Sequence, residues 1–123
     1  QAAVGMAVLD EIERLDLVNN AAEVGRWLTA ELKARALQYS SIGDVRGFGL
    51  FISVEMVSDK VGREPDRALA LALCERLMDK GFLVSYSGKY ENVVKIRPPL
   101  VFSRADGSEF LEAFAASMDE LTE

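Results

Sequence analysis

The spacing of the apolar residues changes from a helical period to a strand period about a third of the way along the chain. In the stretch SSIGDVRGFGLFISVEMVSD, apolar side chains occupy every second position from Phe48 to Met56, which predicts a strand with one mostly apolar face. Gly47 and Gly49 flank the start of this run and predict a bulge or a tight turn. A shorter strand over residues 42–46 would then pair with the long strand as a β-hairpin.

Residues 1–38 carry a helical pattern instead. The segment 1–9 is apolar or small on nearly every side, which predicts a helix that is buried all round. A second, amphipathic helix is expected at about 19–38, because its apolar residues recur with the helical period. Its apolar stripe consists of Val24, Leu28 and Leu32, with Trp27 beside it. The chain also opens without methionine, so we expect it to be a piece of a longer protein.

The second half of the chain predicts a helix followed by two short strands. Pro65–Asp66 is a helix-start signal, while Lys80–Gly81 supplies a basic last turn and a terminal glycine, so the helix should end at Gly81. Short strands are expected over residues 82–86 and 93–97. Pro98–Pro99 cannot donate hydrogen bonds to a sheet, so the second of these strands should end there or lie at an edge.

A closing amphipathic helix is expected after Ser103. Ser103 and Asp106 resemble a capping box, in which a side chain on each side of the helix start binds the other residue's backbone N–H. The apolar face of this helix comprises Phe110, Leu111, Phe114, Met118 and Leu121. The element order α-α-β-β-α-β-β-α predicts an α+β fold, with a small antiparallel or mixed sheet of three to four strands and helices packed on one face.

Composition excludes several classes of function. The chain has 123 residues, half of them apolar, and is most simply a single domain. Its net charge of −6 argues against nucleic acid or an anionic membrane as partner, since both require a basic surface. The absence of histidine removes Ser-His-Asp triads and most zinc sites, and we identify no metal-ligating residues.

The single cysteine and the hydropathy pattern indicate a protein of a reducing compartment. Cys74 lies in the apolar helical run ALALALCERLM, so a buried and inert thiol is a better interpretation than a nucleophile. No apolar stretch reaches the roughly 20 residues of a membrane span, and no signal peptide is visible. We therefore expect a soluble, cytoplasmic protein.

Two cations in the strand over residues 93–97 are the candidate binding residues. Alternation places Val94 and Ile96 on one face of this strand, so Lys95 and Arg97 point together from the other face. Two aligned cations can receive an anion. The alternative is that they lie on a solvated face or pair with some of the many acidic residues.

Three motifs resemble the carboxyl-terminal region of the class III aminotransferases, the ornithine, 4-aminobutyrate and ω-amino-acid type, which use pyridoxal phosphate. They are IGDVRGFGLFISVEMV, MDKGFLVSYSG and NVVKIRPPLVFSRADGSEFLEAF, and the resemblance extends over essentially the whole chain. It implies that residues 1–18 form a helix leaving the large domain. Residues 19–123 would be the small C-terminal domain of a fold-type I pyridoxal phosphate enzyme.

The resemblance also assigns a role to the two cations. In several family members an arginine three positions before the first of the two prolines binds the substrate carboxylate, and this sequence has Lys95 there. Arg97 follows on the same predicted face, so both residues are candidates for binding the substrate anion. The sequence KIRPPL resembles the subgroup near phosphoethanolamine phospho-lyases and alanine–glyoxylate aminotransferase-like proteins, so elimination or decarboxylation stays open beside transamination.

The family's catalytic residues are implied to lie in the large domain. None of the lysines here, at positions 33, 60, 80, 89 and 95, has the family's Schiff-base context. We therefore expect no catalytic or cofactor-binding residue in this chain, no pyridoxal phosphate bound to it, and no activity of the chain alone. The parent enzyme would transfer an amino group between an amino acid or amine and a keto acid.

Two further expectations concern assembly. The apolar side chains of residues 1–9, which include Val4, Met6, Val8 and Leu9, would be covered by the large domain in the parent. In the chain alone they would drive formation of a homodimer or a higher oligomer. The alternative to the enzyme hypothesis is a stand-alone acidic α+β module that binds a small anion or dimerises.

Overall fold

The computed structural model describes residues 2–99 and 101–122, excluding the side chains of residues 2–12 and 15. Within these residues the chain forms three helices and four strands. In chain order they are α1 (Ala2–Ala36), β1 (Ile42–Phe48), β2 (Phe51–Met56), α2 (Arg67–Asp79), β3 (Ser85–Ser87), β4 (Val93–Ile96) and α3 (Arg104–Thr122).

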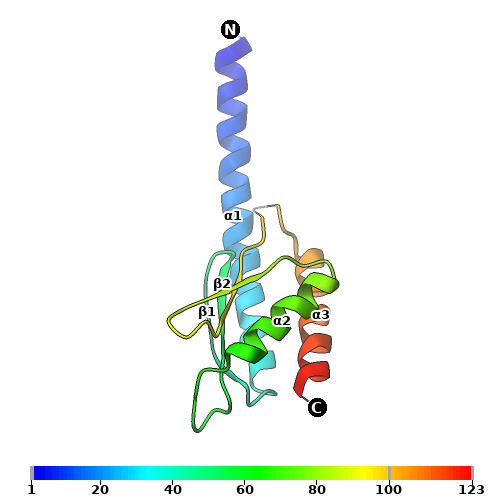
Figure 1. The fold of residues 1–123 in the computed structure, drawn as a ribbon. Coiled ribbons are helices and arrows are strands. Elements are labelled where there is room, and N and C mark those ends of the chain that lie inside the picture. Colours follow the sequence, from blue (N-terminus) through cyan, green and yellow to red (C-terminus); the bar gives the residue numbers. More distant parts are fainter. Residues whose placement is uncertain (1, 100, 123) are drawn as a thin grey trace.

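The strands form one sheet in the order β1-β2-β4-β3, and each neighbouring pair is antiparallel. The three helices lie on one side of this sheet, and the other side is open (Figure 1). The prediction of an α+β fold with helices on one face is confirmed. The central core residues are Leu28 and Leu32 of α1, Ala70, Leu73 and Leu77 of α2, Phe110, Phe114 and Met118 of α3, and Val45, Ile52, Val54, Met56, Val94 and Ile96 of the sheet.

The prediction of two separate helices before the sheet is wrong, because α1 is one continuous helix of 35 residues. No proline or glycine lies between residues 10 and 24 to end a helix there. The apolar pattern does change near residue 18, but the helix continues through this point without a break. The first half of α1 extends beyond the rest of the molecule (Figure 1). No helix in the described part of the chain combines the length and apolar content needed to cross a membrane.

The second half of α1 packs against the sheet as predicted. Val24, Leu28 and Leu32 are buried, and Trp27 is half-buried beside them. The expected burial of residues 1–9 concerns side chains outside the described residues.

The hairpin between β1 and β2 is confirmed, but its turn lies later than predicted. Phe48 pairs with Phe51, which leaves Gly49 and Leu50 as the two turn residues. Gly49 has a φ of +58°, a conformation that glycine adopts without strain. Phe48 was expected on the buried face of the long strand and is instead 90% exposed, because it belongs to β1 and lies on the open face opposite Phe51.

Local sequence signals correctly predicted both ends of α2 and the start of α3. The Asp66 carboxylate accepts the N–H of Leu69 at 3.0 Å, and Gly81, with a φ of +96°, follows the end of α2. Before α3, the Ser103 N–H donates to the Asp106 carboxylate at 3.0 Å, and the Asp106 N–H donates to Ser103 Oγ at 3.1 Å. The capping box is therefore present.

Of the two short strands, β3 begins later than predicted and β4 is one residue shorter than predicted. β3 begins at Ser85, because the Phe82 N–H still donates to the Leu77 carbonyl at 2.8 Å and belongs to the end of α2. β4 ends at Ile96, so Arg97 follows the last residue of the strand. The prolines after Arg97 cannot continue the ladder.

Candidate functional site

The two candidate cations lie on the open face of the sheet. Val94 and Ile96 of β4 are buried in the core, at 0% and 2% exposed, so the intervening residue points away from the helices. Lys95 is half-buried on the open face and Arg97 is exposed just beyond the strand. The predicted alternation of this segment is confirmed.

Phe51 of β2 brings the two cations together. The Arg97 guanidinium carbon lies 4.4 Å from the centroid of the Phe51 ring, and Lys95 Nζ lies 5.6 Å from it. Both distances are within the range of cation–π attraction. Lys95 Nζ also donates to Ser53 Oγ at 3.0 Å, and Ser53 is directly opposite Lys95 in the sheet. Phe51 and Ser53 thus hold cations that would otherwise move freely in solvent.

Sequence reasoning did not single out Phe51 and Ser53. Alternation alone assigned them to the polar side of the long strand, which is the correct side. Their contact with Lys95 depends on the pairing of β2 with β4, two strands separated by α2 and β3. The sequence of either strand alone does not predict that the two strands pair.

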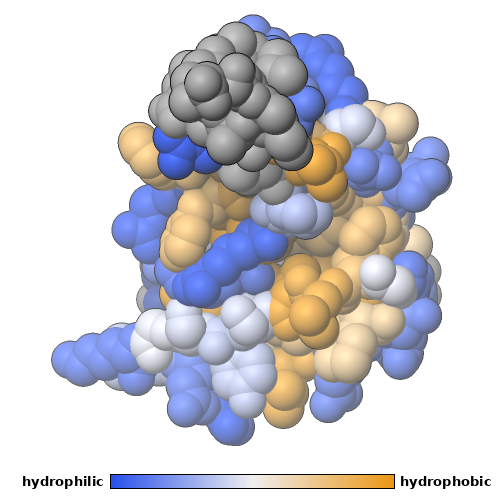
Figure 2. Space-filling view, turned by 90° about the horizontal axis from the view of Figure 1, so that it is seen from above, coloured by the Kyte–Doolittle hydropathy of each residue, from blue (hydrophilic) through white to orange (hydrophobic). Residues whose placement is uncertain are grey.

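The two cations border different hollows of the surface. Arg97 lines a cavity of about 400 Å³ between the segment after α2 and the start of α3, with Phe82, Pro98 and Phe110 among its apolar walls. Lys95 lines a groove of about 300 Å³ on the sheet itself. Viewed from the end from which α1 projects, the surface shows hydrophobic areas next to hydrophilic ones (Figure 2). Phe82 and Phe110 line the cavity at Arg97, and Phe48 and Phe51 line the groove at Lys95, so both cations border apolar surface.

Two acidic residues on the same face of the sheet form ion pairs with arginines other than Arg97. Arg46 Nε lies 3.0 Å from the Asp44 carboxylate, and Arg63 lies 3.2 Å from that of Glu55. Within the described residues, neither Lys95 nor Arg97 forms an ion pair with an acid. The interpretation that these two cations pair with acids of the same chain therefore does not hold for the described structure.

None of the five lysines of this chain is buried in its core, because all of them are exposed or half-buried at its surface. Lys60 donates to the carbonyls of Ala36 and Ile42, and Lys80 binds Glu120. Among the described residues no group of three or more metal-ligating side chains comes together either.

The single cysteine, Cys74, is a buried core residue. It lies on the buried face of α2, within the core, and is 4% exposed. Burial raises the pKa of its thiol to about 11, so the thiol stays protonated near neutral pH. The interpretation of Cys74 as an inert core residue agrees with this environment.

The chain is thus an α+β domain with two cations on the open face of its sheet. The sequence model of the family described as aminotransferase class-III matches residues 1–118. The chain therefore belongs to the class III aminotransferases. A curated relative, alanine–glyoxylate aminotransferase 2 homolog 2, mitochondrial, from Arabidopsis thaliana, is 38% identical over 95% of this chain and 24% of its own length.

Solved structures agree with this membership. A phospholyase from Arthrobacter in complex with phosphoethanolamine superimposes with a TM-score of 0.84 and 34% identity, over 95% of this chain and 28% of that one. An amine transaminase from an uncultivated Pseudomonas species, in its PLP-bound form, gives a TM-score of 0.78 and 34% identity over 94% and 26%. The chain spans about a quarter of the length of these relatives.

Proposed function

We propose that this chain is the small domain of a class III aminotransferase of the ornithine, 4-aminobutyrate and ω-amino-acid type, with residues 1–18 leading from a large domain and residues 19–123 forming the small domain. The complete enzyme transfers an amino group between an amino acid or amine and a keto acid. Membership of the family supports this proposal, as does the fourfold greater length of the relatives.

The large domain would hold the cofactor. When bound, pyridoxal phosphate supplies the carbonyl and the electron sink of amino-group transfer. A related amine transaminase binds this cofactor, whereas the five lysines of the present chain lie at its surface, and Lys60 and Lys80 have other hydrogen-bond partners. In this proposal the chain alone is inactive, and its residues contribute to substrate binding.

The contribution of this chain is to hold the anionic group of the substrate through Lys95 and Arg97. One observation supports this role above the others: both cations lie over the same aromatic ring, on an open face, without an acidic partner among the described residues. Phe51 limits their motion, so less side-chain entropy is lost when an anion binds.

Replacement of each cation by alanine in the full-length enzyme tests the role. Lys95→Ala and Arg97→Ala should each lower kcat/KM for an anionic amino donor by about 1–3 kcal/mol of transition-state binding, or roughly 5- to 150-fold, because a charge-assisted hydrogen bond is lost. Lys89→Ala is the matched control, because Lys89 is an exposed lysine of the loop between β3 and β4. If neither variant differs from this control with any amino donor, the two cations belong to a solvated face.

A further inference from the structure

A third cation lies beside Lys95 on the open face of the sheet. Arg46 of β1 is directly opposite Ser53 of β2, and Ser53 is directly opposite Lys95 of β4. The three residues form a row across three neighbouring strands, and all of them lie on the face opposite the helices. Neighbouring strands are about 4.8 Å apart, so the backbones of Arg46 and Lys95 are roughly 10 Å apart with Ser53 between them.

The row borders one hollow. The groove of about 300 Å³ is lined by Arg46, Gly47, Phe48, Phe51, Ser53 and Lys95. Two arginine or lysine side chains that start roughly 10 Å apart can both reach an anion above the middle strand. The Ser53 hydroxyl is at the floor of this groove, since Ser53 is buried and bonded to Lys95 Nζ.

The charges that face the groove leave it positive. The ion pair of Arg46 with Asp44 uses Nε, and within the described residues no acceptor binds the two terminal nitrogens of Arg46. This pair is exposed, at 67% and 43% of the two side chains, and such pairs contribute little binding energy. Glu55, farther along the face, is neutralised by Arg63. Lys95 therefore faces the groove as an unopposed charge, with Arg46 only weakly compensated.

We propose that Arg46 is a further binding residue of the anion site, and that Arg46, Ser53 and Lys95 together take a doubly charged tetrahedral oxyanion, such as a phosphate monoester, in preference to a carboxylate. This inference rests on the proposed function of Lys95. The attraction between charges is proportional to the charge of the ligand, so each cation attracts a dianion twice as strongly as a monoanion.

Geometry favours the same class of ligand. A phosphate monoester presents three terminal oxygens, which can accept from Arg46, Ser53 and Lys95 at once, while a carboxylate presents only two oxygens in a plane. Lysine and arginine both bind phosphate well, and the arginine fork can use its two terminal nitrogens. An amine that carries a phosphate group is therefore the substrate class that uses the whole row.

Competitive inhibition of the full-length, cofactor-saturated enzyme by methyl phosphate and by acetate tests the inference. Arg46→Met should raise the inhibition constant of methyl phosphate about tenfold, from the loss of one charge-assisted contact, and that of acetate by less than about threefold. Arg26→Met is the matched control, because Arg26 is an exposed arginine of α1 that does not line the groove. The absorbance of the cofactor must stay constant, which excludes exchange at the cofactor's own phosphate site.

The wild-type enzyme supplies a measurement that no folding defect can disturb. The second proton of a phosphate monoester leaves at a pH of about 6, so the dianion fraction rises between pH 5.5 and 7.5. The inhibition constant of total methyl phosphate should fall over this interval several-fold more than that of acetate. An equal change for both ligands would overturn the preference for a dianion.

The outcomes separate this inference from the proposed function. If Lys95→Ala weakens both inhibitors while Arg46→Met resembles the Arg26→Met control, Arg46 is not part of the site and the proposed function stands. If Arg46→Met weakens both inhibitors equally, Arg46 binds the anion but the assignment to a phosphate class is wrong. If neither Lys95→Ala nor Arg97→Ala nor Arg46→Met changes any constant, both proposals fail.

Discussion

At the scale of single residues, two glycines determine how closely α1 approaches the sheet. A Cβ atom at Gly25 of α1 would lie only 2.0 Å from the carbonyl oxygen of Gly49 in the hairpin turn. Nothing in the helix itself requires glycine there, and glycine is a poor helix former. The contact with the turn is therefore the physical reason for Gly25, and it fixes the end of the hairpin at which β2 and Phe51 begin.

Replacing Gly25 by alanine tests this contact. Gly25→Ala should lower the free energy of unfolding by about 1–3 kcal/mol, as overpacking does, although alanine favours an isolated helix by about 1 kcal/mol. Denaturant titration measures the change. Gly62→Ala is the control, since a Cβ there would lie 3.5 Å from its nearest neighbour, in ordinary contact, and stability should stay within about 0.5 kcal/mol. A Gly25→Ala variant as stable as this control would mean that the hairpin turn moves away at little cost.

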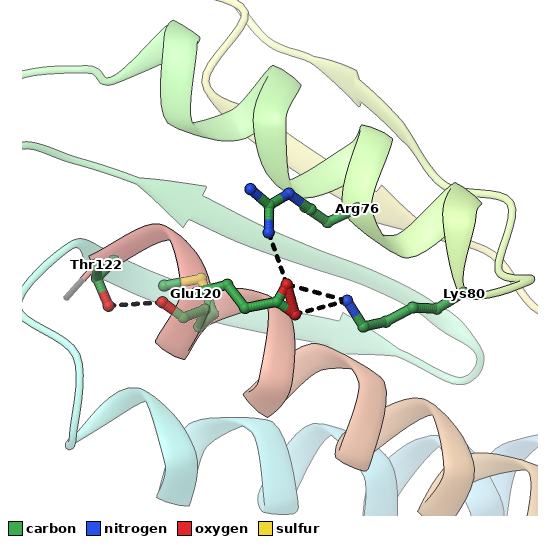
Figure 3. A network of polar contacts seen from close by, with 5 residues as sticks. Arg76, Lys80, Glu120 and Thr122 are labelled. Carbon is green, nitrogen blue, oxygen red and sulfur yellow. Dashed lines mark hydrogen bonds and ion pairs between the residues drawn. The ribbon is translucent and has the colours of Figure 1, made fainter.

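At the scale of elements, Glu120 joins α3 to α2. Its carboxylate lies 2.6 Å from Arg76 Nη1 and 2.9 Å from Lys80 Nζ, one α2 turn apart (Figure 3). Hydrogen bonds from Lys80 above all, and then from Arg76, lower the pKa of Glu120 below its usual 4.5. The three side chains are 30–41% exposed, so the pairs are screened by solvent.

The pH dependence of stability should reveal this link. Because the pKa of Glu120 is lower in the folded chain than in the unfolded chain, its contribution is complete above about pH 4.5 and is lost as the pH falls through the folded-state pKa. Glu120→Gln should remove that part of the acid destabilisation, which thermal unfolding between pH 3 and 7 would show, and added salt should diminish the difference. Glu112→Gln, an exposed position of α3 without an ion pair in the described residues, should retain the wild-type slope. Equal slopes for both variants would contradict the role of Glu120.

Elements also differ in how well the sequence predicts them. The capping box at Ser103 and Asp106 and the glycine after α2 depend on neighbours within four residues, so the sequence determines them locally. The exposure of Phe48 depends on where the hairpin turns, which Gly49 decides together with its contact to α1. Alternation predicted the face of Lys95 correctly, but the row of Arg46, Ser53 and Lys95 required the register of three strands.

At the scale of the whole molecule, burial along α1 changes with position: among its side chains that the structure describes, the buried ones begin only in the second half of the helix. The first fully packed residues of its described part are Ala21 and Val24, whereas Val18 is 49% exposed. Asn20 marks the same boundary, because its side-chain amide donates to the Phe102 carbonyl at 3.2 Å and ties α1 to the segment before α3. On the N-terminal side of Asn20, the ribbon of α1 extends away from the sheet and the other helices (Figure 1).

A chain restricted to residues 19–123 should therefore fold by itself. We expect cooperative unfolding with a free energy within about 1 kcal/mol of that of the 123-residue chain, because a helix segment without tertiary packing contributes little stability in water. Asn19 is a favourable residue with which to begin the shortened helix. Denaturant titration of both chains measures the difference.

The reference for a lost core contact is Leu28→Ala in the same helix, which should cost about 2–5 kcal/mol because Leu28 is completely buried. If the shortened chain loses as much stability as Leu28→Ala, the first half of α1 is part of the small domain, and the boundary at residue 19 is wrong.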